Sequence, residues 1–392
     1  MRALLSYESF AGFAGTETYI LTVARELERR GHEASVYTPN PGPIADQARE
    51  QGLRIIGRGE LPADCDVLLC SDAATCYELM ELVGCPVRMF IAHSVDYALQ
   101  YAPQLRQAGG AVVVMNDRVG RWVKSQARHP PVARLRQPID LGRFLDLGAP
   151  RARARRVLVS SNYLDGARVQ LIERACRACG LELDSIGAKS RMTSTPERAL
   201  AEADIVIGLG RTALEAMAAG RAVYVYGQVG ADGWVTPESY PRMEADGFAG
   251  MATGKALDGE TLAAELRAWS PEMGEANRDL ACAHHGARAH VTELLELAQR
   301  IGSDGDCAAA AVPDGWALAH ELARLVRLEW QARTRAATAV REASHFRAER
   351  ERLEAELVSA GELERQLELS QGRVIDAERR LAEHLATRRW RL

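Results

Sequence analysis

Long apolar segments are missing from this 392-residue chain. No run reaches the ~18–20 apolar residues that a helix needs to cross a bilayer. The first residues, RALLSY, have the pattern of a strand and not that of a signal peptide. We therefore expect a cytoplasmic protein in a reducing compartment.

Metal-binding patterns are missing as well. Among the eight cysteines, Cys176 and Cys179 form a CxxC motif inside a helical pattern, with no second pair at zinc spacing. The histidines His284, His285 and His290 have no acidic neighbours at ligand spacing. The sequence therefore predicts structural thiols and no metal site.

A strong charge of one sign is absent. Lys and Arg total 49 and Asp and Glu total 53, which gives a formal net charge of −4. This balance argues against a general nucleic-acid binder. Lysine occurs only at Lys124, Lys189 and Lys255, which together with abundant alanine indicates coding bias and no particular function.

The chain does contain an alternation of strand and helix patterns from residue 2 to about 300, which is typical of parallel α/β sheets. A basic stretch around Pro138 interrupts the alternation and predicts an interdomain linker. We expect four parts: an α/β domain at 1–145, a second α/β domain at 146–301, a linker at 302–315 and a helical tail at 316–392.

The tail has the composition of a helix and a heptad-like spacing of apolar residues. Two registers are separated by a shift of three residues. The first holds Leu353, Leu357 and Ala360, and the second holds Leu363, Leu367, Val374, Ala377 and Leu381. The pattern predicts a coiled coil or a helical hairpin for self-association or partner binding; a solvated charged helix is the alternative.

The most informative segment is Ala203–Gly227, which has the pattern of a strand, a glycine loop, a helix and a second strand. Gly208 and Gly210 permit a tight turn, and Thr212 is expected to cap the helix. The first turn of such a helix presents N–H groups and a positive dipole end to a phosphate.

Two charged residues follow this loop. Arg211 adds a forked cation, and Glu215 lies one helical turn later, on the same face. The pattern predicts a site for a diphosphate and a polar hydroxyl group. A buried β-α-β unit with a surface Arg and Glu is the alternative.

A second glycine-rich loop, Leu5–Glu17, follows the first strand. Gly12 and Gly15 give it the size of a phosphate loop, and Thr16 is expected to cap the following helix. The loop is not GxGxxG, and no acidic residue stands at the end of the second strand. A plain dinucleotide-binding domain is therefore disfavoured.

Three segments resemble, in the expected order, the retaining glycosyltransferases of family four, which have the GT-B fold. The stretch from Ala14 to Glu17 and the later Gly31–Glu33 are similar to that family's GGxE and GH motifs. RQPIDLGRF is similar to its interdomain segment, and LEAMAAGRAV is similar to its LEAMAxGxPV segment, with Glu215 as the matched acid.

The resemblance implies two Rossmann-like domains that face a cleft, followed here by an added C-terminal helical extension. A nucleotide-sugar would lie mainly on the second domain, with Glu215 on its ribose, and the acceptor mainly on the first. The loop from Gly15 to Glu17 would approach the diphosphate, the sugar or the acceptor. Transfer with retention and without a metal is implied.

The chain departs from the family pattern at two places. Ile207 stands where the family commonly has a second Glu. SSNYLDGAR, after the first strand of the second domain, lacks the usual Arg and Lys in register. Arg168, Lys189 and Arg211 are the candidate replacement cations, with Gly208, Gly210 and Thr212 completing the expected diphosphate site.

His93 follows the strand pattern Val87–Ile91, at the end where open α/β sheets bind ligands. Family members often have a His there that meets the donor sugar. His93 and Glu17 are therefore the candidate catalytic residues; a structural His is the alternative. No protein nucleophile is proposed, because charge stabilisation and positioning suffice.

Two basic-aromatic clusters, Arg118–Lys124 and Thr387–Leu392, have the composition of peripheral membrane contacts. Solvated helix faces are the alternative.

The sequence as a whole predicts a transferase that moves a sugar from a nucleotide-sugar to a polysaccharide, glycolipid or protein acceptor, as in the biosynthesis of cell-surface polysaccharides. The rivals are a nucleotide-sugar epimerase and a non-catalytic scaffold or binding protein that kept the fold.

Overall fold

The structure is a computed structural model. It describes residues 1–303 apart from 13, 106–108, 127–128, 146, 149–150, 163, 165, 188–189, 192 and 194. Beyond 303 it describes 315, 318, 321–331, 333, 350, 352, 356, 361–362, 365–366, 369–374, 376–377 and 379. The expected linker lies almost wholly outside the described residues, as do Lys189 and Thr387–Leu392.

The first sheet has seven parallel strands in the order β3-β2-β1-β4-β5-β6-β7. Its strands are short apolar runs, as both faces of a parallel sheet are covered. They are β1 (Arg2–Ser6), β2 (Glu33–Tyr37), β3 (Arg54–Ile56), β4 (Val67–Cys70), β5 (Val87–Ala92), β6 (Ala111–Val114) and β7 (Val132–Arg134).

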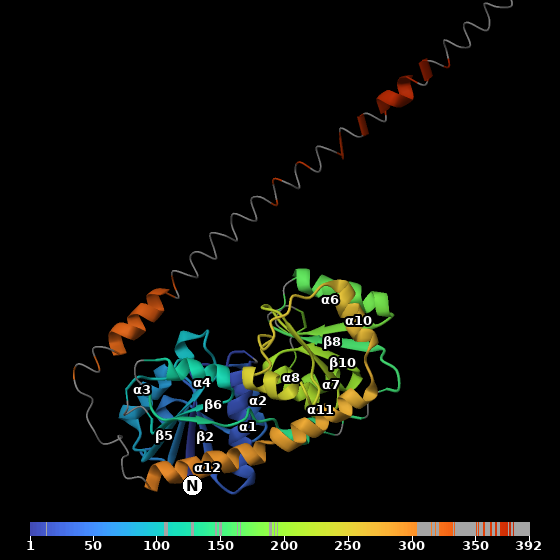
Figure 1. Cartoon of the computed structure of the whole chain (residues 1–392). Helices are drawn as coiled ribbons and strands as arrows, with labels where there is room; N and C mark the ends of the chain where they lie inside the picture. The colour runs from blue at the N-terminus through green and yellow to red at the C-terminus, as the bar shows by residue number, and fades with distance from the viewer. Residues whose placement is uncertain are drawn as a thin grey trace, which may run out of the picture. The chain divides into compact units, whose positions relative to one another are not determined.

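Helices cover both faces of this sheet (Figure 1). One core packs under α1, α2 and α12, and the other under α3 and α4 with the short helix η2 nearby. These elements are α1 (Gly15–Arg29), α2 (Pro43–Glu50), α3 (Ala73–Leu82), η2 (Ala98–Gln100), α4 (Asp117–Lys124) and α12 (Ala287–Ser303).

The second sheet has five strands in the order β12-β11-β10-β8-β9, all parallel except the edge strand β12. They are β8 (Arg156–Ser160), β9 (Glu182–Ile186), β10 (Ile205–Gly208), β11 (Ala222–Tyr226) and β12 (Ala231–Trp234). The two strands predicted within Ala203–Gly227 are confirmed as β10 and β11, whereas β12 was not predicted from the sequence.

The helices around the second sheet also form two layers. α6 and α10 cover one face, and α5, α7, α8, α9 and α11 surround the core on the other. They are α5 (Leu141–Phe144), α6 (Gly166–Cys179), α7 (Pro196–Glu202), α8 (Gly210–Ala218), α9 (Tyr240–Asp246), α10 (Gly259–Arg267) and α11 (Pro271–His284).

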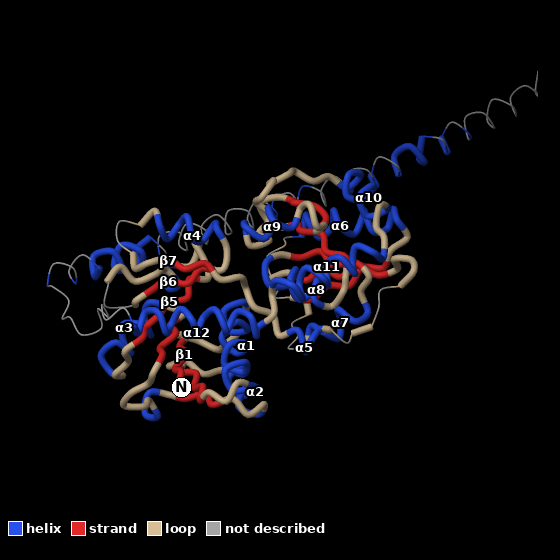
Figure 2. The backbone as a smooth tube through the Cα atoms, turned by 60° about the horizontal axis from the view of Figure 1, so that its bottom comes forward, coloured by secondary structure: helices blue, strands red, loops and turns tan. Residues whose placement is uncertain are grey.

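The last helix of this region, α12, returns to the first sheet. Val291, Leu294 and Leu297 join the core of α1 and α2, and Figure 2 shows α12 beside α1. From the sequence, residues 146–301 were expected in the second domain, because strand and helix patterns indicate which residues are apolar but not which sheet they cover. The apolar stripe of α12 completes the first core.

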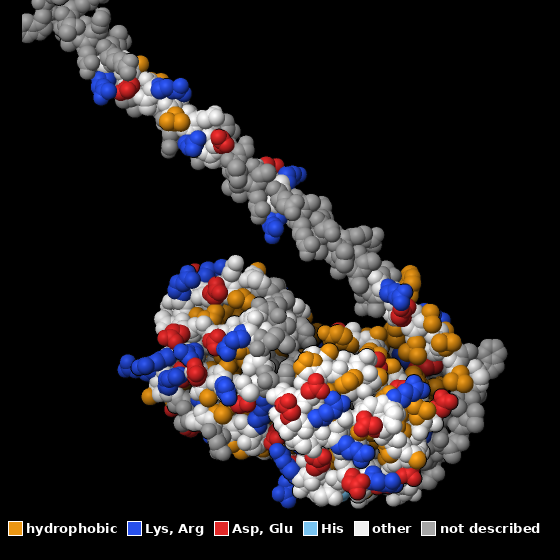
Figure 3. All heavy atoms as spheres, turned by 180° about the vertical axis from the view of Figure 1, so that it is seen from behind, with side chains coloured by type: hydrophobic (Ala, Val, Ile, Leu, Met, Phe, Trp, Pro, Cys, Tyr) orange, Lys and Arg blue, Asp and Glu red, His pale blue; other side chains and the backbone are white. Residues whose placement is uncertain are grey.

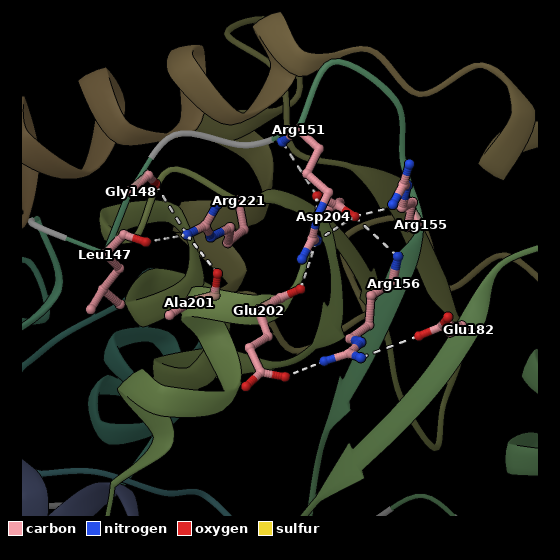
Figure 4. Close-up of polar contacts among 10 residues, drawn as sticks. All are labelled: Leu147, Gly148, Arg151, Arg155, Arg156, Glu182, Ala201, Glu202, Asp204 and Arg221. Carbon is pink, nitrogen blue, oxygen red and sulfur yellow. Dashed lines mark hydrogen bonds and ion pairs between the residues drawn. The ribbon is translucent and has the colours of Figure 1, made fainter.

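A polar cluster anchors the segment that leads from the interdomain linker into β8, at the amino-terminal edge of the second sheet (Figure 4). Asp204, just before β10, accepts hydrogen bonds from the backbone N–H of Arg155 at 2.8 Å and of Arg156 at 3.0 Å. Arg151 Nη1 lies 3.0 Å from the same carboxylate. Arg221, 1% exposed, donates to the carbonyl of Leu147 at 2.9 Å.

Contacts divide the chain into two compact units, Met1–Leu322 and Ala323–Leu392. In the second unit the described residues are helical, as predicted for the tail. No helix among the described residues is both long enough and apolar enough to span a bilayer. On the face drawn in Figure 3, Lys and Arg lie interspersed with Asp and Glu.

Both predicted helix caps are wrong. α1 follows Ala14 and α8 follows Leu209, and no described side chain caps either helix. The hydroxyl of Thr16 instead accepts a hydrogen bond from Gln100 at 2.9 Å. Thr212 lies inside α8, because Gly210, at φ 54°, starts the turn two residues earlier.

Candidate functional site

The carboxyl ends of the strands in the second sheet are lined by loops that pass one another at backbone distance. A Cβ on Gly230 would lie 2.6 Å from the carbonyl carbon of Gly254, and one on Gly250 would lie 2.7 Å from the carbonyl oxygen of Gly230. Only glycine permits such an approach. The predicted glycine loop with Gly208 and Gly210 is therefore part of a larger glycine-lined edge.

The start of α8 lies at this edge. Gly208 ends β10 and Gly210 begins the helix. The N–H of Gly210 donates to the carbonyl of Phe248 at 2.9 Å, so a protein oxygen now occupies one anion-attracting position of the helix end. Thr212 lies in this first turn, with its N–H on the carbonyl of Leu209.

Arg211 joins three parts of the protein. Its Nε donates to Glu215 at 2.9 Å, its Nη1 to the carbonyl of Pro138 at 2.9 Å, and its Nη2 to the hydroxyl of Thr22 in α1 at 3.0 Å. The side chain is 9% exposed. Arg211 therefore lies where the second domain meets the linker and the first domain, with its guanidinium held by protein groups.

Glu215 is 8% exposed and lies on the same helix face, as the i, i+4 spacing predicts. Ile207, matched to the family's upstream acid, lies inside β10 and is fully buried in the core under α6 and α10. That position does not reach the edge where Glu215 lies.

His93 directly follows β5, at the carboxyl end of the first sheet. Its Nε2 lies 3.2 Å from the Ser71 hydroxyl, and its ring meets the edge of Tyr19 at 4.9 Å. Burial, the Arg211 guanidinium and His290 lower the pKa of His93 to about 3. The structure thus brings His93 and Arg211 together, with the imidazole neutral.

Glu17 lies in the first turn of α1, at the same edge of the first sheet. It is 6% exposed, and among the described residues its Oε2 has no hydrogen-bond partner. Burial raises the pKa of Glu17 to about 7, against backbone N–H groups that lower it. A carboxyl group with this pKa exchanges its proton near neutral pH, as general acid–base chemistry requires.

Sequence reasoning missed the polar groups beside Glu17. Gln100 Nε2 donates to the Tyr7 hydroxyl at 3.0 Å as well as to Thr16, and the Glu17 carboxylate contributes to the raised pKa of Tyr7 after burial. Asp72, fully buried, caps α3 by accepting from the Thr75 N–H at 2.8 Å. Tyr7 directly follows β1 and Asp72 lies two residues after β4, a position that was a usable signal for these two residues.

The remaining predicted residues, Arg168, Gly15 and Lys189, do not lie together at one place. Arg168 lies in the first turn of α6 and donates to the carbonyl of Gln228, in the loop between β11 and β12. It is therefore at the glycine-lined edge. Gly15 begins α1, and a Cβ there would meet open space. Lys189 lies outside the described residues.

The chain crosses between the two domains twice, once through the linker near Pro138 and once on its return to α12. The contacts that join these two crossings were not predicted from the sequence. His290 Nδ1 bonds the carbonyl of Arg136, and His285 Nδ1 bonds that of Gln137, each at 2.8 Å. The N–H of Ile139 donates to the carbonyl of His285 at 2.7 Å. With Pro138 held by Arg211, each residue from Arg136 to Ile139 has a partner in another part of the protein.

Each of these histidines also bonds a tyrosine. Tyr19 lies 2.9 Å from His290, and Tyr240 lies 2.8 Å from His285. Burial lowers the pKa of both histidines to about 4, against the backbone bonds that raise it. Both rings therefore hold the linker, while the interpretation that they bind no metal stays a prediction.

The predicted membrane cluster on α4 is only partly available. Arg118 pairs with Asp246 at 3.5 Å, and Trp122 packs on Tyr101 at 4.3 Å between ring centroids. Arg121 and Lys124 are exposed.

A surface hollow of about 700 Å³ lies away from the candidate site. It is lined by Glu26, Arg29, Arg30, His32, Arg288 and Thr292. Arg29 pairs with Asp140 at 2.9 Å, and Arg30 pairs with Glu26 at 3.1 Å. Arg29 and Arg30 are thus each paired with a carboxylate of the protein.

The arrangement as a whole is two sheet edges that meet at Arg211. One carries the helix N-terminus of α8 with Glu215, and the other carries His93 and Glu17. Among the described residues no three His, Cys, Asp or Glu side chains are grouped to hold a metal ion.

Burial raises the pKa of Cys176 to about 12, so that thiol is inert.

No protein-family model matches this chain, and no curated protein does. Solved structures match it at low identity. Anabaena HepE in complex with UDP-glucose aligns with a TM-score of 0.51 at 10% identity, over 76% of this chain and 100% of HepE. HepE in complex with UDP and glucose aligns with a TM-score of 0.50 at 11% identity, over 76% and 99%.

A mutant of S. aureus TarM in complex with fondaparinux, alpha-GlcNAc-glycerol and UDP aligns with a TM-score of 0.49 at 8% identity, over 76% of this chain and 100% of TarM. The likeness to HepE shows the fold: the predicted pair of Rossmann-like domains of the GT-B type is confirmed, with a helical C-terminal region added.

Proposed function

We propose that the protein is a glycosyltransferase that moves a sugar from a nucleotide-sugar to a glycan, glycolipid or protein acceptor, with retention and without a metal ion. The observation that carries the proposal is the position of Arg211 at the start of α8, where it holds both Glu215 and Thr22 of the first domain and adds to the effect of burial in lowering the pKa of His93. The GT-B fold adds support, since HepE of the same fold binds UDP-glucose.

The proposed roles follow from the chemistry of each group. Glu215 accepts hydrogen bonds from ribose hydroxyls, and the N-terminus of α8 with Arg168 and Arg211 balances the diphosphate. The neutral imidazole of His93 hydrogen-bonds the transferred sugar. Glu17 receives or returns the acceptor proton near neutral pH.

The experiment uses the purified full-length chain. Thermal shift against UDP-, GDP-, ADP- and TDP-linked sugars identifies the donor, because a bound ligand raises stability. Transfer to acceptors is then followed by product analysis. Glu215→Gln is expected to lose donor binding, whereas Glu182→Gln, at the opposite edge of the second sheet, is expected to keep it. Equal donor binding by both variants would contradict the assignment.

The buried Ile207 favours a second candidate, a GT-B-like scaffold that binds without chemistry. A scaffold of this kind gives no product with any donor and acceptor. An epimerase, in contrast, converts the donor without an acceptor, so the same product analysis separates all three.

For the tail we propose self-association with a second copy of this chain. Leu322 and Val326 stand one helical turn apart and are 63% and 57% exposed, so this part of the helix presents apolar side chains on one face. The chain truncated after Leu322 is expected to be monomeric by light scattering, and the full chain dimeric or larger. Equal masses would contradict this proposal.

For the exposed residues Arg121 and Lys124 of α4, we propose peripheral contact with a membrane surface, with a solvated helix face as the alternative. Co-sedimentation with phosphatidylglycerol vesicles tests it.

A further inference from the structure

The second residue after the C-terminus of α9 has an unusual backbone conformation. Phe248 has φ 54°, in the left-handed region that a bulky side chain rarely adopts. It is 1% exposed, and its N–H donates to the carbonyl of Met243 at 2.7 Å. The strained conformation directs its own carbonyl to the N–H of Gly210, 2.9 Å away.

The carbonyl of Phe248 therefore covers the first N–H of α8. A carbonyl carries only a partial negative charge, whereas the end of a helix favours a full anion. Under the proposed function a diphosphate oxygen requires this N–H. The carbonyl and the ligand thus compete for one donor.

The same segment is tied to the first domain at its other end. Glu244 Oε2 lies 2.6 Å from Arg134 Nη2, and its Oε1 lies 3.7 Å from Arg136 Nε. Asp246 pairs with Arg118 at 3.5 Å. All three arginines belong to the first domain or to the residues directly after β7.

Asp246 also fixes the loop that follows. Its Oδ2 accepts the N–H groups of Ala249 and Met251, each at 3.1 Å. A Cβ on Gly247 would lie 2.5 Å from the side-chain amide of Asn116, the residue before α4. The segment from Glu244 to Gly250 is therefore held as one piece between the first domain and α8.

We propose that Glu244–Gly250 is a latch that couples the contact between the two domains to access at the N-terminus of α8. This inference rests on the proposed function. While Glu244 is paired with Arg134, the carbonyl of Phe248 stays on Gly210. When that pair separates, the latch leaves Gly210 and relieves the strain at Phe248, and the helix end accepts an anion. Glu244 is thus a positioning residue for the ligand.

The test compares Glu244→Gln and Arg134→Met with the control Glu238→Gln, an exposed carboxylate before α9. Hydrogen exchange of the peptide spanning Leu209–Thr212 reads the latch without ligand. Calorimetry with UDP and with inorganic diphosphate reads the competition. We expect faster exchange of the Leu209–Thr212 amides in both latch variants. Each substitution breaks the Arg134–Glu244 ion pair, one by changing the residue in the first domain and the other by changing the residue in the second.

The latch variants are also expected to bind UDP roughly threefold to tenfold more tightly, since affinity rises with the fraction of molecules in the competent state. The control should match the wild type in both measurements. Unchanged exchange in the latch variants overturns the coupling. Faster exchange with unchanged or weaker UDP binding overturns the competition. If no ligand binds to any variant or to the wild type, both the competition and the proposed function fail.

Discussion

Arg211 serves the fold as well as the candidate site. Its guanidinium holds Glu215, the linker at Pro138 and Thr22 of the first domain at the same time. Five fixed N–H groups make this possible, and lysine has no equivalent. Loss of function on replacing Arg211 therefore has to be separated from loss of the junction.

Arg211→Lys makes that separation measurable. The ammonium group keeps the charge but loses at least one buried hydrogen bond, so the free energy of unfolding should fall by about 1–3 kcal/mol. Urea denaturation measures the loss, with the exposed Arg242→Lys as the control. A fall of the same size in both variants would show that Arg211 is not a junction residue.

Glu17, unlike Arg211, is held in its native position at a cost to stability above neutral pH. Because its native pKa of about 7 lies above the ordinary value of 4.5, the native state binds a proton that the unfolded chain has released between these values. The contribution of Glu17 to stability is therefore present at low pH and lost as the pH rises through 7.

Glu17→Gln, which carries no charge, should be more stable than the wild type by roughly 1–3 kcal/mol at pH 8 and by little at pH 4.5. Its transfer rate should fall and lose the pH dependence near 7. Urea denaturation at the two pH values and a pH–rate profile measure both effects. A variant that is less stable at pH 8 contradicts the burial argument.

At the scale of elements, the two edges of the second sheet are used differently. The carboxyl edge carries glycine loops, α8 and Arg168, whereas the amino edge carries the Asp204 cluster of Figure 4. Burial alone would raise the pKa of Asp204, but the N–H groups of Arg155, Arg156 and Arg151 hold it below its usual range. This carboxylate is an anchor for the linker and not part of the site.

Asp204→Ala should lower the free energy of unfolding by about 2–4 kcal/mol, since three described arginines lose a shared acceptor. Nucleotide affinity of the folded variant should stay within twofold of the wild type by calorimetry. A large loss of affinity with little loss of stability would mean that the two edges are not independent.

The bounds of most elements could be predicted from sequence, because strands and helices have different apolar periods. The i, i+4 pair of Arg211 and Glu215 was predictable for the same reason. Partners distant in sequence, such as Thr22 and Pro138 for Arg211, were not, since local pattern carries no information on them. α9, α11 and β7 were missed, and α12 was attributed to the second domain although it packs on the first sheet.

At the scale of the whole molecule, three buried histidines make the junction sensitive to acid. The pKa of His93 is lowered to about 3, and those of His285 and His290 to about 4, chiefly by burial. All three are neutral in the native state, while the unfolded chain binds protons near 6.5. Their contribution is therefore present above pH 6.5 and lost as the pH falls toward 4.

Glu17 opposes this trend by about one proton, so the free energy of unfolding should fall by roughly 1–3 kcal/mol per pH unit between pH 6 and 5. Urea midpoints at pH 7, 6 and 5 measure the slope. His290→Gln should lower that slope by about one proton. A stability that is flat or rises on acidification would contradict the neutral state of these histidines.

Under the proposed function, a nucleotide-sugar binds at the carboxyl edge of the second sheet. A crystal structure with the nucleotide-sugar that raises the melting temperature most tests it directly. We expect ribose hydroxyls on the Glu215 carboxylate and a diphosphate oxygen on the Gly210 N–H, with the Phe248 carbonyl displaced. A nucleotide bound elsewhere, with Gly210 still on Phe248, would contradict it.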